Sequence, residues 1–231
     1  MIEEEWLTAT EPRPMVRHIG PRAGERKRRL FAVASCRLVS DWFGERRSRH
    51  EIETGERMAD GLPEDAVEAA ELTAEDARME HAVQEGMNPS WAHDGDMRLV
   101  RGVTRACVTD ARESAEVVIA AFEWCDGVRY PFDAGVRTVG NSMPARQCRI
   151  VRDLFGNPFR PVTFFPSWRT ETALALALQM YESRDFSAMP ILADALQDAG
   201  CDNEDILNHC RDLHATHVRG CWVVDLVLGK E

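Results

Sequence analysis

Cysteine and histidine residues gather in the last third of the chain, and both are common zinc ligands. The segment from 201 to 221 contains Cys201, His209, Cys210, His214, His217 and Cys221. Zinc prefers four thiolate or imidazole ligands in a tetrahedron, and proteins commonly supply them as closely spaced pairs. A zinc site is therefore one chemical use of this segment.

The best pair for such a site is His217 and Cys221, because residues four apart share one face of a helix. Cys201 and Cys210 would complete it, although their separation departs from the usual C-x2-4-C spacing. The metal hypothesis is thus a zinc site of Cys201, Cys210, His217 and Cys221. We favour a simpler interpretation without a cofactor, in which the cysteines are small buried apolar groups with surface histidines between them.

A catalytic use of the same residues is weaker. Cys221, His217 and Asp225 follow one another at intervals of four, so a thiolate–imidazole pair is conceivable. A helix interior would hold these side chains parallel and would offer no backbone amides to stabilise an oxyanion. The chain also has no GxSxG, HExxH, CxxC, P-loop or kinase signature. The sequence therefore favours a protein without catalytic activity, and it identifies no catalytic residue.

Charge is distributed unevenly along the chain. Residues 13–49 contain eleven Lys and Arg against three acidic residues, whereas residues 51–96 contain fourteen acidic residues against two arginines. We expect these segments to neutralise each other within one fold. The alternative is a basic surface for a nucleic acid or an acidic protein, and its residues would be Arg26, Lys27, Arg28, Arg29, Arg46, Arg47 and Arg49. The formal net charge of -11 disfavours nucleic acid, because phosphate-binding surfaces carry excess Lys and Arg.

Apolar residues recur with helical spacing and almost never with the two-residue period of a strand. We therefore predict an all-α fold, an irregular multi-helix bundle with a buried C-terminal helix over residues 216–228. Further helices are expected at 2–8, 25–43, 51–58, 64–86, 97–124 and 148–155, and after caps at Thr170, Ser187 and Asp202. A turn is expected at 10–14. The length of 231 residues fits one domain, 1–231, with a possible division near 127–145 into 1–126 and 146–231.

Five aromatic residues crowd around three prolines between residues 155 and 168. We expect a crossing segment that buries these rings over the helices. The alternative is an aromatic-lined ligand cleft. In the helix after Thr170, Leu174, Ala177, Leu178 and Tyr181 are expected to share one face.

The N-terminal segment is acidic and lacks the pattern of a secretory signal. No apolar run approaches the roughly 18 residues that a membrane span requires. Seven scattered cysteines then indicate reduced thiols. We expect a cytoplasmic protein with no membrane partner.

Several segments resemble a paralogous family of uncharacterised proteins from planctomycetes of the Gemmata type. These segments are EEEWLTATEPRPM (3–15), RKRRLFAVASCR (26–37), RDLFGNPFRPV (152–162), FSAMPILADALQDAGCDNEDILNHCR (186–211) and HVRGCWVVDLVLGK (217–230). The resemblance covers roughly half of the chain and implies no activity, cofactor or catalytic residue.

Packing and capping signals therefore outnumber catalytic ones. We expect a cytoplasmic helical module that binds a protein partner or acts as a scaffold, without catalytic activity. One alternative is a zinc-stabilised domain or metalloenzyme that uses the C-terminal cysteines and histidines. Another is a nucleic-acid-binding protein that uses the basic N-terminal helix.

Overall fold

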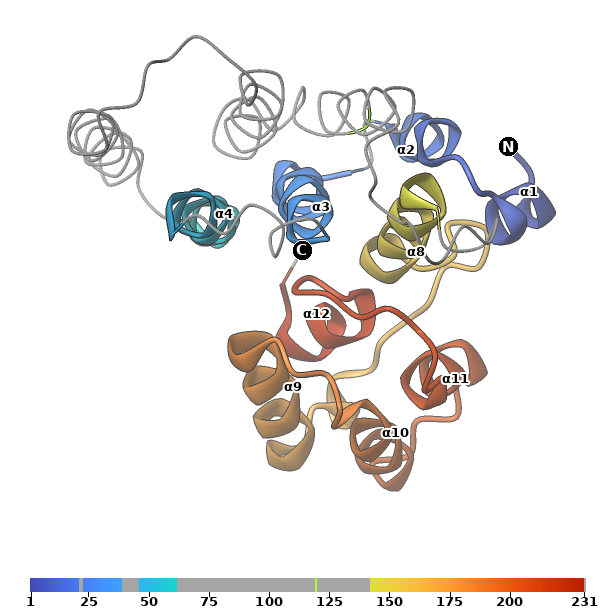
Figure 1. The fold of residues 1–231 in the computed structure, drawn as a ribbon. Coiled ribbons are helices and arrows are strands. Elements are labelled where there is room, and N and C mark those ends of the chain that lie inside the picture. Colours follow the sequence, from blue (N-terminus) through green and yellow to red (C-terminus); the bar gives the residue numbers. More distant parts are fainter. Residues whose placement is uncertain (21–22, 39–45, 62–118, 120–141, 231) are drawn as a thin grey trace, which may run out of the picture. The chain divides into compact units, whose positions relative to one another are not determined.

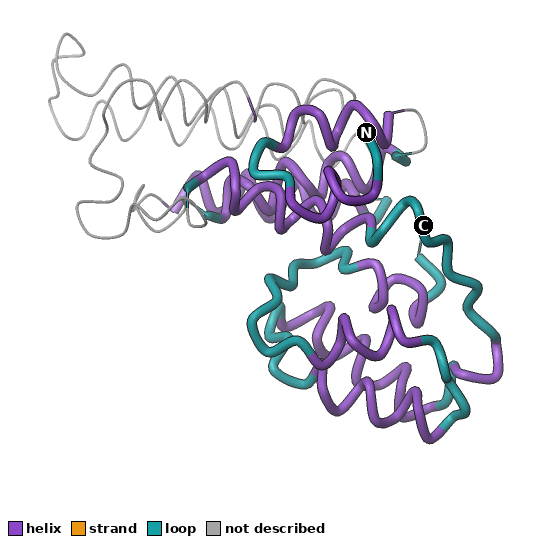
Figure 2. The backbone as a smooth tube through the Cα atoms, turned by 90° about the vertical axis from the view of Figure 1, so that its right-hand side faces the viewer, coloured by secondary structure: helices purple, strands orange, loops and turns teal. Residues whose placement is uncertain are grey.

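The computed structural model describes residues 1–20, 23–38, 46–61, 119 and 142–230, with the backbone alone for 46–51. These residues form helices joined by loops and turns, and none of them forms a strand (Figure 2). The predicted all-α fold is thereby confirmed. No helix in these ranges is long and apolar enough to cross a membrane.

The chain divides into two compact units. The terminal unit consists of residues 1–22 and 135–231, and the middle unit consists of residues 23–134. The helix expected at 64–86 lies outside the described residues, as does that at 97–124 except for Ile119, which is helical, and most of the expected division near 127–145.

The middle unit contains α3 (Glu25–Arg37), which packs against α4 (Arg46–Ala59). Two ion pairs hold this part of the chain together: one joins α3 to α4, and the other joins α3 to Asp60, the residue that follows α4. Arg37 Nε lies 2.8 Å from Glu56 Oε1, and Arg26 Nε lies 3.5 Å from Asp60 Oδ1. Each pair connects the basic segment to the acidic segment, so the expected neutralisation is present in this part of the chain.

The first half of the terminal unit contains α1 (Glu3–Thr8), α2 (Pro12–Ile19) and α8 (Met143–Phe155). Arg152 on α8 donates to the carbonyl oxygens of Trp6 at 2.8 Å and of Ala9 at 2.7 Å. These bonds satisfy carbonyls at the end of α1 that have no partner within the helix. The turn expected at 10–14 gives way at Pro12 to α2, because proline is well accommodated in the first turn of a helix.

The second half contains the 3-10 turn η4 (Pro166–Trp168), α9 (Glu171–Ser183), α10 (Met189–Asp198), α11 (Glu204–Arg211) and α12 (Trp222–Leu228). Helix α10 packs against α9 and α11, and α12 packs against α9 (Figure 1). Their buried side chains form one apolar core. The crossing segment contributes Trp168 to this core, where the rings of Phe164 and Phe165 meet it edge-on. Phe165 is itself more than half exposed.

The C-terminal helix is buried, as predicted, but it is shorter than the expected 216–228. It begins at Trp222, and Val223, Val224 and Val227 are all buried. Residues 216–220 are not helical, and Gly220 has a φ of 93°, which favours glycine. As a result, Cys221 is the N-cap residue of α12 rather than part of a helix interior.

Candidate metal centre

Four side chains that can bind a metal converge inside the terminal unit. They belong to Asp153, His209, His217 and Cys221, and are called the tetrad below. One potential ligand atom from each lies within 4.8 Å of the other three. Among the described residues this is the group whose donor atoms meet at one point.

The distances within the tetrad resemble the edges of a tetrahedron. His217 Nδ1 lies 2.9 Å from Asp153 Oδ1 and 4.0 Å from Cys221 Sγ. His209 Nε2 lies 3.3 Å from the same carboxylate oxygen and 3.2 Å from the same sulfur. Ligands at usual zinc distances stand about 3.3 to 3.6 Å apart in a tetrahedron. Small side-chain adjustments would therefore place all four ligands around one ion.

The histidines present their nitrogens in a way that suits chelation better than proton relay. Each ring directs a single nitrogen at both Asp153 Oδ1 and Cys221 Sγ. In a catalytic triad, by contrast, the histidine uses one nitrogen for the acid and the other for the nucleophile. A tetrad whose rings each offer one nitrogen to a shared point can therefore serve as a ligand set.

Each tetrad residue is placed by a different element of the terminal unit. Asp153 lies in the last turn of α8, His209 lies in the last turn of α11, His217 belongs to the loop before α12, and Cys221 caps α12. The amide of Val218 donates to Asp153 Oδ2 at 2.8 Å. This bond fixes the carboxylate and leaves Oδ1 directed at the tetrad.

Gly156 lets the end of α8 approach the start of α12. Its φ is 63°, and a Cβ atom built on it would lie 3.2 Å from the ring of Trp222. Both the backbone conformation and the close approach therefore favour glycine. Asp153 and Cys221, which lie three residues before Gly156 and one before Trp222, are brought together by this contact.

Substitution Gly156→Ala is expected to destabilise the protein by about 1 to 3 kcal/mol and to weaken metal binding, because relief of the clash moves α8 from α12. Denaturant unfolding and zinc titration measure the two effects. Gly200→Ala is the matched control. Gly200 also has a positive φ, but a Cβ atom built on it would have no neighbouring atom within 4 Å. Equal zinc affinity in the two variants would contradict this account of Gly156.

The tetrad is largely removed from solvent. The side chains of Asp153, His217 and His209 are 1%, 8% and 17% exposed, and Cys221 is fully buried. Burial raises the pKa of the Cys221 thiol well above its usual value, and the negative charge of Asp153 raises it further. Burial alone would also raise the pKa of Asp153. Hydrogen bonds from His209 and His217 outweigh that effect and hold the pKa of Asp153 below its usual value.

A divalent cation bound by the tetrad would balance these charges. A carboxylate and a thiolate together contribute two negative charges, and neutral imidazoles contribute none. A dication bound by the tetrad would give a neutral complex, which removes the penalty of an uncompensated charge in the core. Metal binding would also stabilise the thiolate of Cys221 that burial disfavours.

The structure brings together two residues of the expected zinc set, His217 and Cys221. Cys201 and Cys210 lie in the apolar core and do not belong to the tetrad. Burial raises the pKa of the Cys210 thiol to about 12. This placement agrees with the simpler interpretation of these two cysteines as buried apolar groups.

Asp153 and His209 complete the tetrad and were not part of the expected set. His209 belongs to the same Cys/His-rich segment as the expected ligands and is the neighbour of Cys210. Asp153 is far away in sequence. Its only signal was an acidic residue between the apolar positions Val151 and Leu154 of an amphipathic helix.

The expected basic surface is partly used inside the middle unit. Arg26 pairs with Asp60, and Arg29 Nη1 lies 3.8 Å from Met58 Sδ. The side chains of Arg46, Arg47 and Arg49 lie outside the described residues. Binding of a nucleic acid or of an acidic partner at this surface stays a prediction.

Comparison of the chain with family models, curated proteins and solved structures finds no match. The resemblance to the planctomycete family therefore stays a prediction. A function for the chain rests on the geometry and chemistry of the tetrad.

Proposed function

We propose that this protein is a zinc-stabilised helical module in which the tetrad binds a structural zinc ion. The observation that carries the proposal is the convergence of one nitrogen from each histidine on a shared carboxylate oxygen and a shared sulfur. The same convergence also fits a cluster held by hydrogen bonds alone, and metal analysis separates the two.

The ligand types select the metal. Calcium and magnesium prefer oxygen ligands throughout, whereas a thiolate with two imidazoles suits zinc. A carboxylate oxygen is also an ordinary zinc ligand. The protein supplies all four ligands from a buried position, and structural zinc sites share this feature, whereas catalytic sites keep one position for water or substrate.

A bound ion would connect parts of the terminal unit that are distant in sequence. It would join α8 to α11, to the loop of His217 and to the start of α12. Arg152, next to Asp153, already binds carbonyls at the end of α1. Because the unfolded chain has no preformed site, the free energy of metal binding would count toward folding.

Elemental analysis of the purified protein tests the proposal, and the expected result is stoichiometric zinc. Cys221→Ser and His209→Ala should each lose it. Cys210→Ser is the matched control, because Cys210 is a buried thiol on the same helix as His209 but is not in the tetrad. The proposal would be contradicted by a natural protein without zinc. It would also be contradicted by a Cys210→Ser variant that loses zinc as fully as Cys221→Ser does.

Protein binding is the second candidate, and the outer face of α9 favours it. Of the four residues expected to share a face of this helix, Ala177 and Tyr181 are buried whereas Leu174 and Leu178 are 37% and 51% exposed. The residues of α9 that belong to the core are Ala173, Ala177, Met180 and Tyr181, and the two leucines lie outside it. One helix face with two leucines four apart is self-complementary, so we propose a second copy of the chain as its partner.

Replacement of both leucines by serine is then expected to convert a dimer into a monomer in sedimentation experiments. The free energy of unfolding of the monomer should change by only about 0.5 kcal/mol, because these side chains are exposed. Serine at Gln179, an exposed position of α9 outside the four-residue spacing of the leucines, should leave the dimer intact. A natural chain that is monomeric at all concentrations would rule out this partner.

A further inference from the structure

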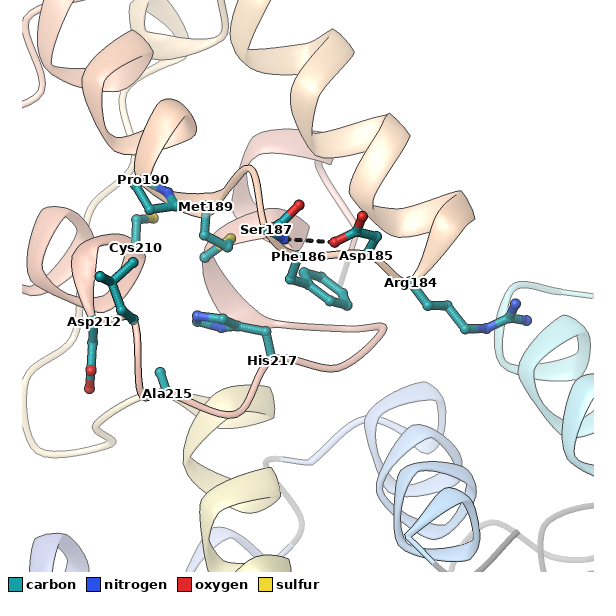
Figure 3. Close-up of a pocket in the computed structure, with 11 residues that line it drawn as sticks. Arg184, Asp185, Phe186, Ser187, Met189, Pro190, Cys210, Asp212, Ala215 and His217 are labelled. Carbon is teal, nitrogen blue, oxygen red and sulfur yellow. Dashed lines mark hydrogen bonds between the residues drawn. The ribbon is translucent and has the colours of Figure 1, made fainter. Parts of the chain in front are cut away.

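A pocket of about 330 Å³ lies in the terminal unit on the far side of the His217 ring from α8 (Figure 3). It is formed by the turn after α9, the first residues of α10 and the loop before α12. We call it the loop pocket. Its apolar lining includes Phe186, Met189, Pro190 and Leu213, and its volume is that of a small-molecule site.

The two carboxylates in the lining of the loop pocket accept hydrogen bonds from backbone amides two residues further along the chain. Asp185 accepts a hydrogen bond from the amide of Ser187 at 3.0 Å, and Asp212 accepts one from the amide of His214 at 2.9 Å. Figure 3 shows the Arg184 side chain extending away from the ring of His217. Ser187, Cys210 and His217 complete the polar part of the lining.

One nitrogen of His217 has no hydrogen-bond partner among the described residues. Nδ1 belongs to the tetrad, whereas Nε2 is fully buried and unpaired. Figure 3 shows the ring lying between Met189 and Ala215 in the lining of the loop pocket. A metal-bound histidine almost always donates its second N–H to a carboxylate, a carbonyl or water. An acceptor in the loop pocket would reach Nε2 after a shift of the side chains that cover this atom.

Zinc would decide what kind of group that nitrogen can bind. When a metal occupies the lone pair of Nδ1, the ring proton resides on Nε2, which becomes a hydrogen-bond donor. In the neutral metal-free ring, Nδ1–H donates to Asp153 and Nε2 is an acceptor. Metal binding therefore changes this buried nitrogen from a hydrogen-bond acceptor to a hydrogen-bond donor.

We propose that the loop pocket binds a small, mainly apolar molecule with one hydrogen-bond acceptor, such as a carbonyl oxygen, and binds it best in the zinc form. The acceptor takes the Nε2–H of His217, and the apolar body contacts Phe186 and Met189. This inference rests on the proposed zinc site and adds a ligand that regulates it. Since linkage is reciprocal, the ligand strengthens zinc binding by the factor by which zinc strengthens ligand binding.

Cyclohexanone and cyclohexane test the proposal as a matched pair, because the two rings differ by one acceptor oxygen. Binding is followed by the nuclear magnetic resonance shifts of His217 Nε2–H and of the Met189 methyl group. In the zinc-loaded full chain, cyclohexanone is expected to bind roughly tenfold more tightly than cyclohexane, since an unpaired buried donor is costly. In the chelated protein this preference is expected to disappear.

Two variants test whether cyclohexanone binds in the loop pocket. Ala215→Leu places a larger side chain in the loop pocket and should abolish the response to cyclohexanone while zinc remains bound, which shows that the fold is kept. Ala175→Leu adds the same atoms at an exposed position of α9 and should respond like the natural protein. Equal binding of the two rings in the zinc form, or an unchanged response in Ala215→Leu, overturns the proposal.

The test separates this inference from the proposed function. A protein that holds zinc but ignores cyclohexanone contradicts the ligand site and leaves the zinc site intact. A protein without zinc contradicts the metal proposal before any probe is added, and the zinc-dependent preference falls with it.

Discussion

Removal of zinc by a chelator is expected to lower the free energy of unfolding of the terminal unit by about 4 kcal/mol when free zinc had been a thousandfold above its dissociation constant. The ion binds the folded tetrad and has no comparable site in the unfolded chain. A loss of this size lowers the melting temperature of a domain of this length by more than about 10 °C. Thermal and denaturant unfolding with and without chelator measure the effect.

Cys221→Ser provides the control for chelation. Its unfolding should be insensitive to chelator, because the variant has already lost a ligand. Trp222 gives a local signal, since its ring centroid lies 5.2 Å from that of His209. Natural protein with identical unfolding curves under both conditions would show that the tetrad is held by hydrogen bonds and not by a metal.

Asp153→Asn is expected to cost about 3 to 5 kcal/mol even in the metal-free protein, and to abolish zinc binding. The amide has nearly the shape of the carboxylate, so the effect comes from charge and hydrogen bonding rather than from packing. In the natural chain, Asp153 bonds to His217 and to the amide of Val218 and lies close to His209. Removal of one member of a buried charged network leaves the others uncompensated.

The cost of Asp153→Asn should depend on pH. The pKa of Asp153 is lower in the folded protein than its usual value. Its stabilising contribution is therefore complete above the unfolded-state pKa of about 4 and is lost as the pH falls through the lower folded-state pKa. Denaturant unfolding of both metal-free proteins at neutral pH and near pH 3 measures this difference, which should shrink at the acidic end.

Asp194→Asn is the matched control for Asp153→Asn. Asp194 is also paired with a cation, Arg211, at 3.4 Å, but its side chain is 74% exposed. Exposed pairs contribute about 0 to 1 kcal/mol, so this change should be nearly neutral and zinc should remain bound. A similar small cost at both positions would mean that the Asp153 network contributes little to the fold.

The all-α fold could be predicted because its signals are local. Thr170 accepts a hydrogen bond from the amide of Ala173 as the expected cap of α9, and α8 ends at Phe155 before Gly156 as its glycine indicated. Elsewhere the observed cap differs from the expected one by one residue, since Asn203 rather than Asp202 caps α11. On α9, Ala177 and Tyr181 are buried while Leu174 and Leu178 are exposed, because burial depends on tertiary packing and not only on apolar spacing.

The tetrad could be predicted only in part, because its geometry is tertiary. His217 and Cys221 were chosen as neighbours on a helix, yet they meet because a loop precedes α12 and Cys221 caps that helix. Asp153 reaches them through the close approach of Gly156 and Trp222, which no spacing in the sequence reveals. A tertiary contact of this kind brings the fourth ligand from a separate helix.

The most direct test of the tetrad is X-ray absorption spectroscopy at the zinc edge of the purified protein. The tetrad predicts one sulfur ligand, from Cys221, and three nitrogen or oxygen ligands, from His209, His217 and Asp153. Zinc with three sulfur ligands would instead support the set of Cys201, Cys210, His217 and Cys221. A protein that contains no zinc, or zinc without a sulfur ligand, would contradict the proposed site.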